Sequence, residues 1–121
     1  MWMLDTNAII KCLKIDKNIF LNKKDLFTTI FTTLEHPPSI NEENIKVIYP
    51  QNFHYERAFR YALLLRKKGI PIPIIDLLIA TITIDKNFIL ISDDGHFNLF
   101  QKIEPRLKII NVNDFINQIL I

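Results

Sequence analysis

The sequence contains few of the residues that mark special classes of protein. Among its 121 residues only one is cysteine and only two are glycine. The single Cys12 excludes an internal disulfide framework and any zinc site built from several thiolates. So few glycines exclude collagen-like and glycine-rich chains, and a hydrophobic content of 49% excludes an intrinsically disordered one.

The sequence also has no long uninterrupted apolar run, and its first residues are not expected to form a signal peptide. The most apolar stretch, residues 70–84, is interrupted by two prolines and an aspartate, which makes it a poor membrane span. Residues 1–4 reach Asp5 without a positively charged lead, unlike a signal peptide. We therefore expect a soluble, cytoplasmic protein with one domain over residues 1–121 and no membrane contact.

Short apolar runs alternate with longer segments whose apolar residues recur at helical spacing. Strands that are almost continuously apolar and separated by helices are typical of a parallel sheet covered on both faces. The predicted fold class is therefore α/β, a three-layer α/β/α sandwich with a central parallel sheet. The predicted strands are 1–4, 26–31, 88–91 and 107–110, and the predicted helices are 8–13, 53–68, 75–86, 96–102 and one from about residue 113.

Four acidic residues fall where the carboxyl ends of the predicted strands would gather. Asp5 and Asp94 follow strands, Glu35 lies one helical turn beyond another, and Asp76 begins a helix after an apolar segment. Ligands bind at this edge of an open parallel sheet, so we expect the four to converge. Each residue alone has a simpler explanation, as a helix cap, a turn residue or a solvated helix residue.

Convergence of four carboxylates would require a counter-charge. Two unit charges about 4 Å apart repel by about 4 kcal/mol at an effective dielectric constant near 20, so the group needs a cation or large pKa shifts. The three histidines, His36, His54 and His96, do not pair at the spacing of zinc ligands. Oxygen donors favour Mg²⁺ or Mn²⁺, ions that bind phosphate oxygens and activate water. Phosphodiester hydrolysis is the chemistry that this set of residues predicts.

Four short blocks in this order resemble the PIN domain, the nuclease fold of VapC-type toxins and of RNA-processing nucleases. Residues 4–7 (LDTN) are similar to the family's opening motif, and residues 28–35 (TTIFTTLE) to its strand followed by a helix bearing Glu. Residues 75–80 (IDLLIA) resemble its D-x-L-I-A block, and residues 91–97 (ISDDGHF) its closing T-x-D-x-[DH]-F block. The resemblance covers essentially the whole chain.

The resemblance implies an endoribonuclease dependent on Mg²⁺ or Mn²⁺, the toxin of a type II toxin–antitoxin pair. Asp5, Asp76 and Asp94 would hold the metal and Glu35 would complete the catalytic acids. Ser92, where the family usually has Thr, and Asn7 would support the site. RNA would be hydrolysed by water without a covalent enzyme intermediate, and the partners implied are a second copy of the chain and a small antitoxin protein.

The sequence departs from the family pattern at two places. Position 96 is His where many members carry a further Asp, and we interpret His96 as a surface residue without a role in preference to a substrate contact. Pro37 and Pro38 shorten or bend the helix after Glu35, which leaves the direction of that carboxylate open. Asp93 is interpreted as a turn residue and not as a metal ligand.

Two basic segments suggest how RNA would be held. Residues 11–24 and residues 56–68 each carry a net charge of +4, although the whole chain carries only +2. Candidate phosphate contacts are Lys11, Lys14, Arg57 and Arg60; the alternative is that they are solvated faces of two helices. The apolar segment 40–49 suggests a protein interface.

Two other functions remain open at this stage. One is a PIN nuclease of RNA maturation or decay that has no antitoxin. The other is a non-catalytic α/β binding module, for example a receiver-like signalling domain of the same length. A binding module should have no Mn²⁺ site that is lost when Asp5 and Asp94 are both replaced by Asn. Loss of Mn²⁺ binding in that double variant would therefore exclude it.

Overall fold

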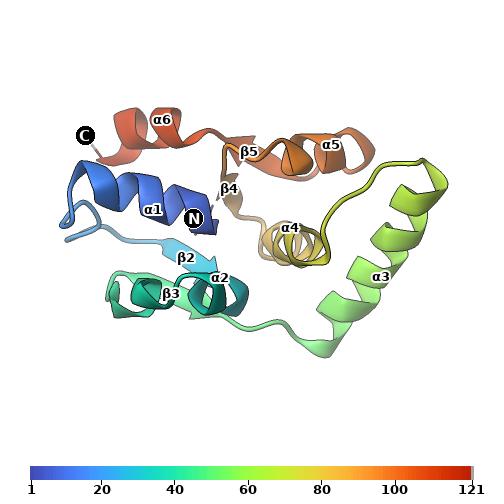
Figure 1. The fold of residues 1–121 in the computed structure, drawn as a ribbon, viewed down its shortest axis with the longest axis horizontal. Helices are drawn as coiled ribbons and strands as arrows, with labels where there is room; N and C mark the ends of the chain where they lie inside the picture. Colours follow the sequence, from blue (N-terminus) through green and yellow to red (C-terminus); the bar gives the residue numbers. More distant parts are fainter. Residues whose placement is uncertain (121) are drawn as a thin grey trace.

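The computed structural model describes residues 1–120 of the chain. Five strands and eight helical segments follow one another along them, an α/β arrangement as the periodicity predicts (Figure 1). The strands are β1 (Trp2–Leu4), β2 (Leu26–Thr29), β3 (Ile45–Ile48), β4 (Ile89–Ile91) and β5 (Lys108–Ile110). The helices are α1 (Thr6–Ile15), α2 (Ile30–Glu35), α3 (Asn52–Lys67), α4 (Ile74–Lys86), α5 (Gly95–Ile103) and α6 (Val112–Phe115), with a 3-10 helix at Pro37–Asn41 and a π-helix at Ile116–Leu120.

All five strands join one parallel sheet in the order β3-β2-β1-β4-β5. From β1 the chain builds outward through β2 to β3, and after α4 it returns to pair β4 on the other side of β1. The register of this central pair places Leu4 opposite Ile91. The strand order therefore reverses between β1 and β4, and the crevice at their carboxyl ends is where an open α/β sheet binds ligands.

Alternate residues of the central strands point into two separate cores. Leu4 and Ile91 pack against α1 and α6 on one face of the sheet. Met3 and Leu90 pack against α4 and α5 on the other face. These four side chains are fully buried, and Figure 1 shows the two helical layers on opposite sides of the strands. The predicted three-layer α/β/α class is confirmed.

Helix α3 lies outside α4 at the edge of the molecule (Figure 1). Its N-terminal half contacts the C-terminal end of α4, where His54 Nε2 lies 2.9 Å from Asp85 Oδ2. Its last turn lies beside the start of α4, because Leu65 and Arg66 share a pocket with Ile74. The two helices therefore contact each other near both ends, and they cross steeply, since Figure 1 shows α3 lengthwise and α4 nearly end-on. Within residues 1–120 no helix is long and apolar enough to cross a membrane.

Two predictions for the region between residues 26 and 49 were wrong. The strand predicted to reach residue 31 ends at Thr29, whose hydroxyl accepts a hydrogen bond from the Thr32 backbone and caps α2. Residues 45–48, predicted as part of an apolar connection, form edge strand β3, whereas the interface suggested for residues 40–49 stays a prediction. Their apolarity arises because Ile45 is buried in a core. Residues at 40 and 49 are still exposed.

Candidate active site at the carboxyl ends of β1 and β4

The four acidic residues predicted from the sequence lie around one small pocket. It has a volume of about 90 Å³ and opens where the strand order reverses. Since the four carboxylates come from four different elements, the fold and not local sequence brings them together. The pocket is lined by Asp5, Thr6, Asn7, Glu35, Asp76, Ile79 and Asp94.

Asp5 is the most buried of these acids, with only 6% of its surface exposed. Its Oδ1 accepts a hydrogen bond of 2.8 Å from the Ala8 backbone and so caps α1. Its Oδ2 accepts a short hydrogen bond from the Ser92 hydroxyl. Burial raises the pKa of Asp5 to about 6, and the charges of Asp94 and Asp76 add to this effect although the two hydrogen bonds oppose it.

Ser92 connects the segments that follow the two central strands, β1 and β4. Its hydroxyl donates to Asp5 and accepts a hydrogen bond of 3.0 Å from the Asp94 backbone. The short serine side chain therefore fixes an Asp5 oxygen relative to the loop that carries Asp94. This is the arrangement that the prediction of Ser92 as a supporting residue requires.

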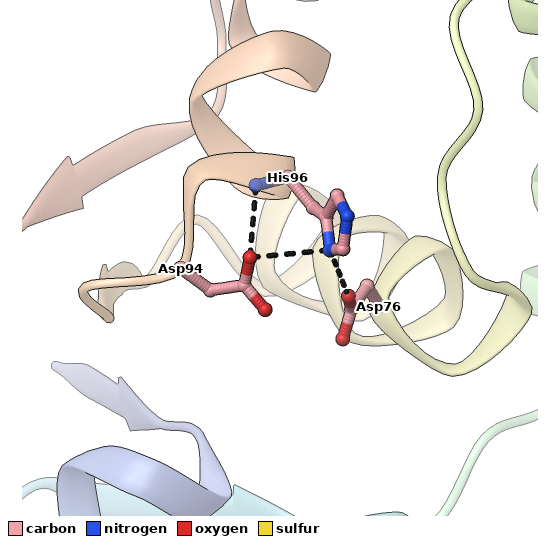
Figure 2. Close-up of side chains that lie close together, drawn as sticks. All are labelled: Asp76, Asp94 and His96. Atoms are coloured by element: carbon pink, nitrogen blue, oxygen red, sulfur yellow. Dashed lines mark hydrogen bonds and ion pairs between the residues drawn. The ribbon is translucent and has the colours of Figure 1, made fainter.

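Asp94 and Asp76 face each other across His96 (Figure 2). The His96 ring Nδ1 lies 3.1 Å from Asp76 Oδ2 and 3.1 Å from Asp94 Oδ1. Burial raises the pKa of Asp76, the charge of Asp94 raises it further, and the contact with His96 lowers it. No pattern in the sequence indicates these contacts: His96, interpreted there as a surface residue without a role, has a ring that contacts two of the pocket's carboxylates.

Asp76 reaches the pocket from the start of a buried helix, as the sequence predicts. Residues 70–73 form no strand, and Asp76 is the third residue of α4 and not its cap, which is Pro73. The first turn of a buried helix, and not the end of a strand, places this carboxylate at the sheet edge. Ile79, almost one turn further along α4, also lines the pocket.

Glu35 is exposed and is directed to the pocket by a residue that the sequence analysis missed. The Thr6 hydroxyl donates a hydrogen bond of 3.4 Å to Glu35 Oε2. Helix α2 ends at Glu35, before the prolines, as the shortened helix predicts. Thr6 lies inside the LDTN motif beside Asp5, and that position was the available signal. Asn7 also lines the pocket but is exposed.

The basic candidates lie at different distances from this pocket. Lys11 makes an ion pair of 2.5 Å with Asp93, whose other oxygen accepts from the Val112 backbone at 3.0 Å. Asp93 is therefore occupied outside the acidic pocket, as its interpretation as a turn residue requires. Arg57 contacts Asp85 at 3.4 Å, and nine residues of helix place Asp85 about 14 Å along α4 from Asp76. Lys14 and Arg60 are exposed on α1 and α3.

The donor atoms in the pocket suit a divalent cation. Several carboxylate oxygens face a small polar space, and one donor atom each from Asp76, Asp94 and His96 lies within 4.8 Å of the others. Burial chiefly raises the pKa values of Asp5 and Asp76 and the charges of neighbouring carboxylates raise them further, so holding these side chains ionised in the pocket has a free-energy cost. A positive ion would remove that cost, so the residues present fit a metal centre.

Comparison with known proteins supports the resemblance found in the sequence. No family model and no curated protein matches the chain, but solved structures do. The chain is similar to a chain of VapBC-1 from nontypeable Haemophilus influenzae, with 26% identity and a TM-score of 0.72, over 93% of this chain and 98% of that one.

Two further structures are similar in fold. One is DNA-bound VapBC from Salmonella typhimurium, with 19% sequence identity and a TM-score of 0.71. The other is VapBC2 from Rickettsia felis bound to a DNA fragment from its promoter, with 17% sequence identity and a TM-score of 0.67. The alignments cover 92% and 91% of this chain and 97% of each matched chain. The predicted resemblance to the PIN domain of VapC-type toxins is confirmed by these matches.

Proposed function

We propose that this protein is the toxin of a VapBC-type pair and that it hydrolyses RNA phosphodiester bonds at a Mg²⁺ or Mn²⁺ centre. One observation carries the proposal: four carboxylates from four elements line one pocket at the point where the strand order reverses. Helix capping explains the acid at two of these positions, but it does not explain why all four share a pocket. We also propose that residues 1–121 form a single nuclease domain.

The chain's own residues have distinct roles in this proposal. Asp5, Asp76 and Asp94 hold the cation, and the Ser92 hydroxyl fixes the orientation of Asp5. Glu35, held by Thr6, orients the attacking water and accepts its proton. The bound cation supplies stabilisation of negative charge on the phosphate and lowers the pKa of water. Asn7, at the rim, offers an amide for a phosphate oxygen.

Cleavage of total cellular RNA with and without Mg²⁺ or Mn²⁺ tests the proposal. Wild type should cleave only with metal, and Asp5→Asn and Asp76→Asn should each lower the rate by at least about a hundredfold. The matched control is Asp93→Asn, which removes a carboxylate next to Asp94 that pairs with Lys11 outside the pocket. Equal cleavage by wild type and Asp5→Asn would mean that a contaminating nuclease is responsible.

RNA binding is proposed for Lys11, Lys14, Arg57 and Arg60, and the salt dependence of affinity tests each. Replacing a true phosphate contact lowers the slope of log affinity against log salt by about one. We expect Lys14→Ala to lower it, since Lys14 is exposed on the helix that Asp5 caps. If the slope is unchanged in a variant, the replaced residue does not contact an RNA phosphate.

An antitoxin partner is supported by the three similar structures, each of which is a VapBC complex. Toxicity on expression that a co-expressed small partner relieves would support this role. A nuclease of RNA maturation or decay would show the same metal-dependent cleavage without such a partner. A non-catalytic binding module would show no cleavage that depends on Asp5.

A homodimer is proposed through the exposed apolar surface of α3. Phe59 is 64% exposed, and two shallow pockets run along this surface, which is formed by Tyr55, Phe59, Leu63 and, from α4, Ile74. Glu56 and Arg60 flank Phe59 with opposite charges, so two antiparallel copies of α3 could pair them across a two-fold axis.

Light scattering after size-exclusion chromatography tests the dimer. Phe59→Asp should yield monomers, whereas Leu21→Asp, a change at an equally exposed apolar residue elsewhere, should not. A monomeric wild type would remove the proposal. If Arg60 lies in the dimer interface, Arg60→Ala should weaken the dimer and leave the salt dependence of RNA binding unchanged.

A further inference from the structure

His96 stands where a nitrogen ligand of the proposed cation would stand. Its Nδ1 atom lies 3.1 Å from an oxygen of Asp76 and 3.1 Å from an oxygen of Asp94. Figure 2 shows the ring at the start of α5, with this nitrogen directed at both carboxylates. The ring thus faces the same space as the acids that the proposed function uses to hold metal.

The spacing of these atoms matches that of neighbouring ligands around one ion. Donors about 2.1 Å from an octahedral cation are separated by about 3.0 Å when they occupy adjacent positions. Both nitrogen–oxygen distances at His96 agree with this separation. The ring would therefore need little movement to share an ion with Asp76 and Asp94.

The position of His96 is fixed by its neighbours on both sides. Its backbone nitrogen donates a hydrogen bond of 2.9 Å to Asp94 Oδ1, in the cap of α5. The next residue, Phe97, is buried in the core that covers one face of the sheet. The imidazole itself is 43% exposed, which leaves it accessible to an ion arriving from solvent.

We propose that His96 is a ligand of the divalent cation and that its nitrogen makes the centre select Mn²⁺ over Mg²⁺. The inference rests on the proposed metal centre and deepens it. Mg²⁺ binds oxygen ligands almost exclusively, whereas imidazole binds transition metals well. A carboxylate at this position would preserve an all-oxygen site, so the identity of residue 96 sets the selectivity.

Pulsed electron paramagnetic resonance of Mn²⁺ bound to the full chain tests ligation directly, because it detects coupling to an imidazole ¹⁴N. We expect this coupling in wild type and its loss in His96→Asp and His96→Ala. The matched control is His36→Gln, since His36 is next to Glu35 and its Nδ1 lies 2.7 Å from Ser39 Oγ. This control should keep the coupling.

Calorimetric titration of the same proteins tests the selectivity. His96→Ala should lower Mn²⁺ affinity on the order of ten- to a hundredfold or more. Loss of a residue that only orients a metal ligand already lowers affinity by that factor, and loss of a ligand should lower it at least as much. His96→Asp should lower the ratio of Mn²⁺ to Mg²⁺ affinity on the order of tenfold or more, because it restores an oxygen donor.

The alternative is that His96 only provides a hydrogen-bond partner for the two carboxylates. Mn²⁺ bound to wild type without ¹⁴N coupling, or with coupling that survives in both His96 variants, overturns ligation. An unchanged affinity ratio in His96→Asp overturns the selectivity. Both results leave the proposed nuclease standing, whereas absence of Mn²⁺ binding by wild type overturns this inference and the proposed metal centre together.

Discussion

Replacing Asp5 by Asn should stabilise the metal-free protein at neutral pH even though it removes a residue assigned to the active site. Asp5 is 6% exposed and lies among the carboxylates of the pocket. Its pKa is raised from 3.8 to about 6, chiefly because burial disfavours the charged form. Ionisation of Asp5 therefore costs free energy in the folded state. Asn cannot ionise, so Asp5→Asn removes this cost.

The sign of the pH dependence follows from the direction of this shift. Between pH 3.8 and about 6 the folded protein holds a proton on Asp5 that the unfolded chain has already released. The free energy of unfolding therefore falls as pH rises through this window, and it stays lower above it. At about 1.4 kcal/mol per pH unit, the complete effect is about 3 kcal/mol.

The expected gain is smaller than this limit because Asn does not reproduce every contact. Its amide can still cap α1 through an oxygen, but it loses the bond that Ser92 donates to Asp5 Oδ2, worth about 1 kcal/mol. We therefore expect Asp5→Asn to raise the free energy of unfolding by about 2 kcal/mol at pH 7. For a chain of this size the melting temperature should rise by roughly 6–10 °C.

Urea denaturation in the presence of EDTA, at several pH values from about 4 to 8, measures the effect. The gain of Asp5→Asn over wild type should be near zero or negative at about pH 4 and should grow to its full size above about pH 6. Asp114→Asn, which removes an exposed carboxylate, should follow the wild-type profile. A gain that is the same at every pH, or no gain at all, would refute the argument from burial.

Three further predictions concern the pocket and the core. Mn²⁺ at about a hundred times its dissociation constant should raise the free energy of unfolding of wild type by about 2.7 kcal/mol, measured by thermal unfolding. In the same assay Mn²⁺ should stabilise Asp76→Asn far less. Ser92→Ala should raise the pKa of Asp5 above about 6, because the lost hydrogen bond lowers it; a carboxyl titration followed by NMR measures this. Leu90→Ala, at a fully buried residue of β4, should cost about 2–5 kcal/mol in urea denaturation.

The convergence of the acids could be predicted from the sequence because it depends on topology. The segments ending at Leu4 and Ile91 are apolar and are followed directly by polar residues. This pattern predicts buried parallel strands, and the two segments are central strands of the sheet. Once these strands are adjacent, Asp5 and Asp94 must lie at one edge. No knowledge of side-chain packing is needed for that step.

Other features depend on tertiary contacts that local patterns do not contain. Residues 45–48 pair with β2 at the edge of the sheet. Their short apolar run alone is equally compatible with an interface. The approach of the His96 ring to Asp76 requires α4 and α5 to pack side by side, and the two residues are 20 positions apart in the sequence. A histidine alone in a sequence gives no indication of such a neighbour.

A helix cap and a place in the acidic pocket are compatible at Asp5 and Asp94, because each carboxylate has two oxygens and can make more than one contact. One oxygen of each residue accepts a backbone hydrogen bond and caps a helix. That bond fixes the carboxylate plane, and in Asp5 it leaves the second oxygen directed toward Ser92 and the pocket. Capping thus holds these two acids at the edge of the pocket, so finding a cap at such a position does not argue against the proposed metal site.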